Sequence, residues 1–360
     1  MKRPTIQLLF SIILLALFSC SSKKVAKEAV TNSPMQKKLK ALIIDGENNH
    51  GVFPMTTMMM SDFLKETGLF TVEYARTANT WQGPHYDQES LGIKVEDAPI
   101  LLEKYPLPNH PKTTSVKEPV PDPNFSPNFS AYDVVISNMG WKASTWPAAT
   151  QANFEKYIQE GGGLVVVHAA NNSWGDWSAY NKMIGLGGWG GRNTASGPYV
   201  YYNDQGKRIA DPSEGACGSH GPAQEYVLTT RSPSHPIMKG LPNKWLHAKD
   251  ELYDRLRGPA ENMTVLATGY SDVEGNSPPW DKKTKGTGRH EPLLMTIDYG
   301  KGRIFHSGMG HMDYSMECVG FQTTFQRGAE WAATGKVTQE IPTDFPTATA
   351  VSTRVWANRK

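Results

Sequence analysis

The chain has few cysteines, little net charge and no apolar run long enough to span a membrane comfortably. Three cysteines in 360 residues are too few for a disulfide scaffold. The formal charge of +2 comes without a dense Lys/Arg stripe, so we expect no nucleic-acid partner. Charged residues make up 20% and aromatic residues 10% of the chain, a composition that excludes a disordered protein. The length suits one large or two modest domains.

Several catalytic motifs are also missing. There is no GxSxG turn for a hydrolase serine and no GxxxxGK[ST] phosphate loop. No GxGxxG sequence follows a predicted strand, and there is no HExxH zinc motif. These absences argue against a serine hydrolase, a P-loop nucleotidase, a dinucleotide-dependent oxidoreductase and a zincin protease.

The N-terminal segment indicates export. A mostly apolar run of signal-peptide length follows Lys2 and Arg3 and ends at Phe18. The next residues complete Leu17-Phe18-Ser19-Cys20, which resembles a bacterial lipobox. The alternative is a plain secretory signal with an incidental cysteine. We predict a lipoprotein anchored in the bacterial cell envelope, in the periplasm or outer membrane, with a signal peptide at 1–19, lipidation of Cys20 and a polar tether at 20–38.

Short apolar runs alternate with helical spacing through the first half of the remaining chain. This pattern is typical of an α/β domain with a parallel sheet flanked by helices. A late hairpin and a closing helix follow it, and a polar tail at 337–360 carries few core signals. Residues 78–130 lack periodicity and are expected to form a long surface excursion, a candidate lid. The predicted strands are 40–46, 70–74, 132–137, 164–168, 225–230, 291–298 and 303–307, and the predicted helices are 54–67, 150–160 and 321–333.

Three histidines follow predicted strands. His50 comes after the first strand, His168 ends the fourth, and His311 follows the late hairpin. The carboxyl ends of parallel strands meet at one edge of a sheet, so we expect His50 and His168 at the same edge. Imidazoles gathered there can act as general acids or bases, or can bind a divalent metal such as Zn²⁺. The three are therefore both the candidate catalytic residues and the candidate metal ligands.

Other residues support or surround this predicted site. Nearby carboxylates are Glu47, Asp250, Glu251 and Asp313, of which Glu251 is the catalytic candidate. His306 lies within an apolar strand and is predicted to be a hydrogen-bonded core residue. His220 is expected to have a local role in a flexible loop, and His85 is given no role.

Aromatic and polar side chains are mixed in the predicted loops. Aromatic faces pack against the C–H faces of sugars, and amides and carboxylates bind their hydroxyl groups. Core packing is the alternative for each tryptophan. The candidate substrate-binding residues are Asn138, Trp141, Asn171, Trp174 and Glu47.

Five short segments occur in an order that resembles a known family, the ThuA-like (trehalose utilisation) proteins. The resemblance covers roughly residues 39–336 and implies a class I glutamine amidotransferase-like (flavodoxin-like) α/β fold, here with long loop insertions. The segments are Gly161-Gly-Gly-Leu-Val-Val-Val-His168-Ala-Ala170, His235-Pro-Ile-Met-Lys-Gly-Leu-Pro242, Asp250-Glu251-Leu-Tyr253, Tyr299-Gly-Lys-Gly-Arg-Ile-Phe-His306 and Gly308-Met-Gly-His311.

The resemblance limits the function. Glutamine amidotransferases carry a cysteine at the sharp turn after the strand that matches Leu164–Val167, and this chain has His168 there. A glutaminase is therefore excluded. Family members are associated with disaccharide and keto-sugar catabolism, which implies a small-molecule sugar as partner. We expect a hydrolase, lyase or isomerase that acts on a glycoside or keto-sugar. The alternative is a non-catalytic carbohydrate-binding lipoprotein.

Overall fold

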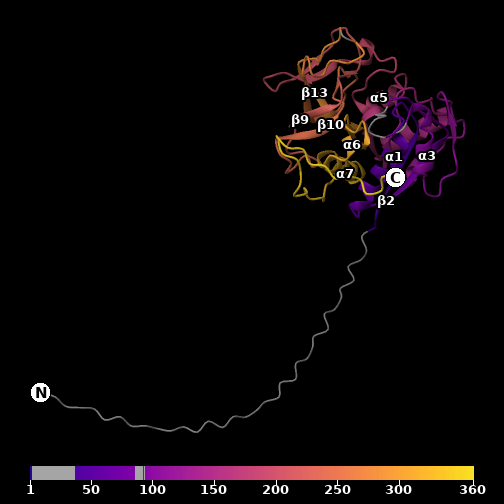
Figure 1. Ribbon diagram of the computed structural model, residues 1–360, viewed down its shortest axis with the longest axis horizontal. Coiled ribbons are helices and arrows are strands. Elements are labelled where there is room, and N and C mark those ends of the chain that lie inside the picture. The colour runs from indigo at the N-terminus through magenta and orange to yellow at the C-terminus, as the bar shows by residue number, and fades with distance from the viewer. Residues whose placement is uncertain (2–36, 86–91, 93, 282) are drawn as a thin grey trace. The chain divides into compact units, whose positions relative to one another are not determined.

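Six neighbouring strands of one sheet run parallel in the computed structural model (Figure 1), which describes residues 1, 37–85, 92, 94–281 and 283–360. The predicted signal peptide and Cys20 lie outside the described residues, and residues 38–360 form one unit. Within the described residues, no helix combines the length and the apolar character that a membrane span requires. In order across the sheet the parallel strands are β3 (Thr114–Val116), β2 (Phe70–Gln82), β1 (Leu39–Asn48), β4 (Val134–Ser137), β5 (Gly163–Val167) and β14 (Gly302–Ser307).

The sheet continues beyond β14 with antiparallel strands. The predicted late hairpin is confirmed, because β13 pairs with β14 through a turn at Gly300, whose φ of +61° favours glycine. Next to β13 (Arg289–Tyr299) the sheet continues with β12 (Met263–Ser271), β9 (Gln224–Thr230) and β10 (Lys244–Asp250). In addition, β6 (Tyr199–Tyr202) pairs with β13, and β7 (Arg208–Asp211) pairs with β6. A separate two-stranded sheet joins β8 (Ser219–His220) and β11 (Tyr253–Asp254).

Helices cover both faces of the sheet, as predicted. Side chains alternate between the two layers along each central strand, so Ile43 packs on one face and Leu42 on the other. The strands are consequently apolar on both faces, as a buried parallel sheet requires. One face carries α1 (Phe53–Glu66), α3 (Ile100–Lys104), α6 (Asp313–Met316) and α7 (Val319–Thr334), and the other carries α4 (Ala148–Gln159) and α5 (Ser178–Ile184).

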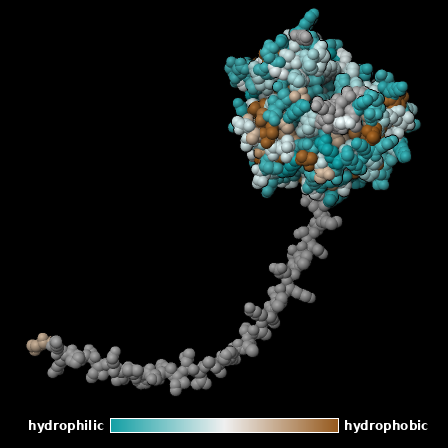
Figure 2. All heavy atoms as spheres, in the orientation of Figure 1, coloured by the Kyte–Doolittle hydropathy of each residue, from teal (hydrophilic) through white to brown (hydrophobic). Residues whose placement is uncertain are grey.

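The outer surface is mostly polar, because the large apolar side chains are buried in these two layers. On the face shown in Figure 2, hydrophilic residues cover most of the unit and hydrophobic residues form small separate groups.

The prediction for residues 78–130 is partly wrong. β2 extends to Gln82 rather than ending near Tyr74, and β3 pairs with its end. Phe125 and Phe129 then enter the core beside Trp146. The segment therefore extends the sheet and contributes to the core on both faces, with Leu101 of α3 on one face and Phe125 and Phe129 on the other.

The C-terminal tail packs against the domain, although its composition gave few core signals. Trp356 is 5% exposed, and its indole donates to Asp62 on α1 at 3.0 Å. Arg359 forms ion pairs with Asp313, the first residue of α6, and with Glu317, which follows its last residue. The tail thus fastens α1 to the segment that follows His311.

Trp356→Ala is expected to lower the free energy of unfolding by about 3–5 kcal/mol, because it removes a large buried side chain. Urea unfolding followed by circular dichroism measures this change. Val355→Ala is the matched control, since Val355 is 75% exposed and should change stability by less than about 0.5 kcal/mol. Equal effects of the two substitutions would show that the tail does not pack as described.

Candidate functional site

Four strand ends place their next residues at one edge of the sheet. His50 follows β1, His168 follows β5, and His311 lies in the loop after β14. The strands β1, β4, β5 and β14 are parallel neighbours, so these three loops leave the sheet on the same side. Glu251 joins them from the end of β10. The predicted convergence of His50 and His168 is confirmed, and it includes His311.

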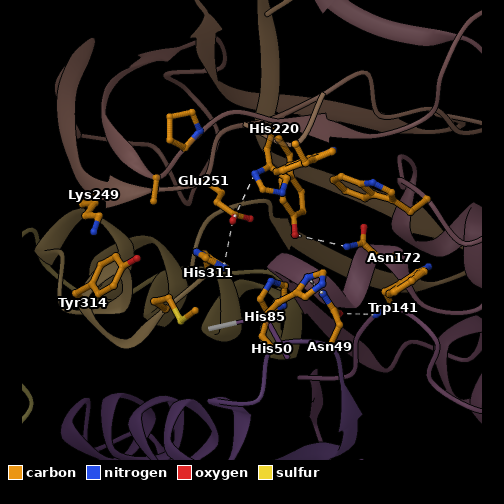
Figure 3. A pocket seen from close by; sticks show the side chains of 16 residues that line it. Asn49, His50, His85, Trp141, Asn172, His220, Lys249, Glu251, His311 and Tyr314 are labelled. Atoms are coloured by element: carbon orange, nitrogen blue, oxygen red, sulfur yellow. Dashed lines mark hydrogen bonds and ion pairs between the residues drawn. The ribbon is translucent and has the colours of Figure 1, made fainter. Parts of the chain in front are cut away.

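A cavity of about 810 Å³ opens at this edge (Figure 3). His50, Glu251 and His311 line its centre. Figure 3 shows Trp141 and Asn172 on one side of Glu251, and Lys249 and Tyr314 on the other. The remaining lining residues include Asn49, His85, Trp189, His220, Tyr253 and Trp280.

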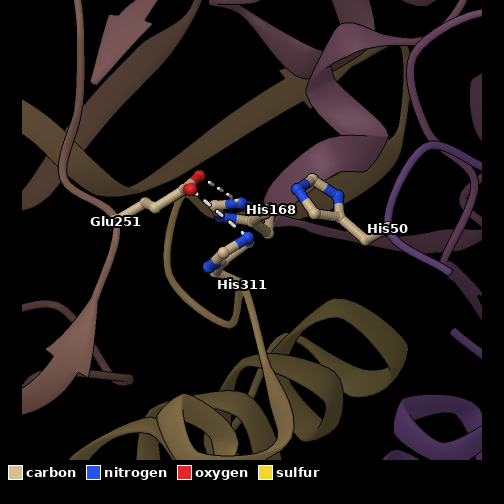
Figure 4. Close-up of side chains that lie close together, drawn as sticks. All are labelled: His50, His168, Glu251 and His311. Atoms are coloured by element: carbon tan, nitrogen blue, oxygen red, sulfur yellow. Dashed lines mark ion pairs between the residues drawn. The ribbon is translucent and has the colours of Figure 1, made fainter. Parts of the chain in front are cut away.

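The histidines and the glutamate face one another closely (Figure 4). One candidate ligand atom from each of His50, His168, Glu251 and His311 lies within 4.8 Å of the other three. His311 Nε2 is 3.3 Å from Glu251 Oε1, and His168 Nε2 is 3.6 Å from Glu251 Oε2. The four residues are 2–9% exposed. They form what we call the His₃Glu cluster.

Backbone contacts orient these side chains. The Nδ1 of His168 lies 2.9 Å from the carbonyl oxygen of Gly308, which can only accept, so Nδ1 carries the proton and Nε2 has a free lone pair. Asp250 accepts from the backbone N–H groups of Gly310 at 2.8 Å and His311 at 3.1 Å, which fixes the loop of His311. His247 Nε2 contacts the same carboxylate at 2.8 Å. Asp250 is therefore a positioning residue.

His168 occupies a special backbone position. Its φ is +44°, a left-handed conformation that a non-glycine residue adopts at an energetic cost. The sharp turn from β5 into the short helix His168–Asn172 requires it. Such strain is commonly kept where a side chain must point in a functional direction, and here the turn aims His168 at Glu251.

Burial sets the charge state of the cluster. Desolvation lowers the pKa of His311 to about 4, and desolvation together with neighbouring imidazoles lowers the pKa of His50 well below 6.5. Burial alone would raise the pKa of Glu251, but contacts with His311 and His168 outweigh it and lower that pKa. At neutral pH, His50 and His311 are neutral and Glu251 is ionised, as metal ligands must be.

The cluster also contains buried polar atoms that lack partners. Within the part of the chain that the structure describes, His50 Nδ1, His168 Nε2 and Glu251 Oε2 have no hydrogen-bond partner. An unsatisfied buried polar atom is costly, and a native protein usually keeps one for a ligand or an ion. Imidazole nitrogens with one carboxylate are a ligand set that suits Zn²⁺ and related ions. The residues present therefore fit a divalent metal.

Several predicted contact residues do not line the cavity, which corrects the prediction for them. Glu47 accepts from the backbone of Val120 at 2.9 Å and from Ser144, so it orders neighbouring loops. The Asn138 amide donates to Thr57 at 2.9 Å beneath the cavity. Trp141 does line it.

The other misplaced residues pack in the interior. The Asn171 amide donates to His306 Nε2 at 3.0 Å, which also confirms His306 as a hydrogen-bonded core residue. Trp174 is buried against Trp146, with its indole N–H on a carbonyl oxygen. Asp313 pairs with Arg359 of the tail rather than with the histidines.

Two cavity histidines were missed. His85 follows the end of β2, next to β1, so the rule that found His50 would have found it if the full length of β2 had been predicted. His220 lies on the two-residue strand β8, and its Nδ1 is 3.4 Å from Glu251 Oε1. No pattern in the sequence marked it.

The fold and site define an α/β protein with an amidotransferase-like sheet, in which a buried His₃Glu cluster lies at the edge where parallel strands end. A family model described as ThuA, trehalose utilisation, matches residues 101–332. The chain belongs to this family, which is linked to carbohydrate metabolism.

One similar solved structure supports this assignment. A ThuA-like protein from Parabacteroides merdae is 40% identical, with a TM-score of 0.71 over 88% of this chain and 98% of its own. A ThuA-like protein from Bacteroides uniformis is 17% identical, with a TM-score of 0.45 over 83% of this chain and 93% of its own. No curated protein matches the chain.

The cluster is expected to bind one Zn²⁺ or similar divalent ion per chain. His168→Ala and Glu251→Gln should each weaken binding by more than about 100-fold, because loss of a ligand exceeds the ~10–100-fold effect of an outer partner. Asp250→Asn should weaken metal binding by only ~10–100-fold, because Asp250 is an outer partner that positions His311. Competition with a chromogenic chelator measures the Kd values.

His290→Ala is the control for this titration, because His290 lies on β13 and does not line the cavity. Its Kd should equal that of the unmodified protein. Equal Kd values for His168→Ala and His290→Ala would exclude the cluster as the metal site.

Proposed function

We propose that this chain is an enzyme of carbohydrate catabolism that acts on a glycoside or keto-sugar at the His₃Glu cluster, with a divalent metal. The observation that carries the proposal is a set of unpartnered ligand atoms in the His₃Glu cluster, beside a cavity whose lining also includes aromatic rings and the amides of Asn49 and Asn172. Such walls suit a sugar ring, which has apolar C–H faces and hydroxyl edges. The family's link to trehalose utilisation supports the same substrate class.

His50, His168, His311 and Glu251 would hold the metal. A bound divalent ion acts as a Lewis acid on a carbonyl or hydroxyl oxygen. In a keto-sugar, the carbonyl group acidifies the neighbouring C–H bond. A base near that bond can then remove the proton, which begins an isomerisation or an elimination.

His220 is placed to be this base. Its Nδ1 lies 2.8 Å from the carbonyl oxygen of Gly221, an acceptor, so Nδ1 carries the proton and Nε2 is left with a lone pair. The ring lines the cavity beside Glu251 without belonging to the cluster. His220 can therefore take up a substrate proton while the cluster residues stay engaged.

The test is turnover of keto-glycosides, keto-trehalose first, by the metal-loaded mature protein. His168→Ala should abolish turnover through loss of the metal site, and His220→Ala should reduce kcat by about 10²–10⁴-fold with the metal retained. His290→Ala should be unaffected. Full turnover by His168→Ala would disprove the assignment. Sugar binding without turnover, which survives removal of metal and of His168, would instead favour a carbohydrate-binding lipoprotein.

We further propose that the protein is a lipoprotein of the cell envelope, anchored through Cys20. The basic start, the apolar run and the lipobox-like Leu17-Phe18-Ser19-Cys20 support this proposal. In a bacterial host, the full chain should incorporate a labelled fatty acid and partition into detergent, and Cys20→Ser should do neither. Cys217→Ser is the matched control and should behave as the unmodified chain. Labelling that persists in Cys20→Ser would contradict the proposal.

A further inference from the structure

The short helix α6 is linked to two members of the His₃Glu cluster. It begins two residues after His311. The Oγ of Ser315 in this helix donates to the carbonyl oxygen of Lys249 at 2.8 Å, two residues before Glu251. The helix has only four residues and no side-chain cap, so it is unstable without tertiary contacts. The contacts that hold α6 therefore also determine where His311 lies.

Two acidic side chains of this segment are withdrawn from water. Asp313 is fully buried, and Glu317 is 8% exposed. Within the part of the chain that the structure describes, Arg359 forms the ion pair of each: one guanidinium nitrogen contacts Asp313, and the other lies 2.8 Å from Glu317 Oε1. A buried carboxylate that loses its cation keeps the cost of its desolvation without compensation. Removal of Arg359 would therefore leave two buried negative charges at α6.

The preceding part of the tail brings Arg359 to this helix. The backbone N–H of Trp356 donates to Glu317 Oε1 at 2.9 Å. The backbone N–H of Val319, the first residue of α7, donates to the carbonyl oxygen of Ser352 at 2.9 Å. The tail thus runs along the segment that joins α6 to α7 and is hydrogen-bonded to it at both points. Arg359 therefore reaches α6 although it is distant in the sequence.

We propose that Arg359 is a positioning residue of the His₃Glu cluster, which holds α6 so that His311 faces Glu251. Arg359 does not line the cavity, so it acts without contact with metal or substrate. Asp250 fixes the backbone of His311 from the side of β10, and Arg359 fixes the following helix from the side of the tail. The inference rests on the proposed function, because His311 is one of the residues that would hold the metal.

The first test is metal binding by the mature protein, measured as the Kd for Zn²⁺ by chelator competition and as the visible absorption of the Co²⁺-loaded protein. Arg359→Ala should weaken Zn²⁺ binding by ~10–100-fold, the range for loss of an outer partner of a ligand. Its Co²⁺ spectrum should shift towards that of His311→Ala, because the bands depend on the ligand set and its geometry. Arg359→Lys should regain most of the lost affinity, since it keeps the positive charge.

Arg354→Ala is the matched control for metal binding. Arg354 lies in the same tail, but its side chain pairs with Asp344, and both side chains are about half exposed. Because an exposed ion pair contributes little, the Kd of this variant should stay within about twofold of that of the unmodified protein, with the same Co²⁺ spectrum. Equal Kd values and equal spectra for Arg359→Ala and Arg354→Ala would overturn the inference.

The second test uses the metal-free protein, so it is independent of the proposed function. In Arg359→Ala, the backbone amides of residues 309–318 should exchange with deuterium at least about tenfold faster than in Arg354→Ala, because local opening becomes easier. Exchange in α4, on the other face of the sheet, should not change. Faster exchange throughout the chain would show a general structural role and overturn the inference, as would an unchanged rate at 309–318. Absence of metal binding by the unmodified protein would contradict the proposed function, and the exchange rates would still decide the role of Arg359.

Discussion

The parallel alignment of β1, β4, β5 and β14 is the constraint on which the site depends. Parallel neighbours must send their following loops to the same edge, so residues far apart in sequence, such as His50 and His311, meet there. The antiparallel extension adds the fourth member, because β10 ends at Asp250 beside this edge. The carboxylate of Asp250 then connects the antiparallel and parallel parts of the sheet, since it accepts hydrogen bonds from the backbone of the loop that carries His311. The position of the site is therefore determined by the order and direction of the strands in the sheet.

The three histidines of the cluster were predicted from the sequence because the ends of apolar strands can be recognised in it. Apolar runs identified β1, β5 and β14, and the residues that follow them were the three histidines of the cluster. Glu251 was predicted as the catalytic candidate among four nearby carboxylates, although no sequence pattern set it apart from the others. The structure does, because Glu47 is consumed by backbone donors and Asp313 by an arginine from the tail.

Other features were not predictable for physical reasons. β2 continues through polar residues because Arg76 forms two hydrogen bonds with the buried carboxylate of Asp45, at 2.7 and 2.6 Å. Such a strand shows no apolar periodicity, so its length and the place of His85 were missed. Asn138 and Asn171 follow strands as the histidines do, but their short side chains turn inward to Thr57 and His306. The direction of a side chain within a loop depends on tertiary contacts that a single sequence does not display.

The left-handed backbone of His168 separates the shape of the turn from the chemical group that the turn presents. In the amidotransferases that the sheet resembles, the turn after the matching strand presents a thiol. Here the same kind of turn presents an imidazole, with a φ of +44°. The strained turn thus sets the direction of its side chain, whichever chemical group that side chain carries. Chemistry can change by exchange of one side chain at such a position, while the scaffold beneath it and its energetic cost remain the same.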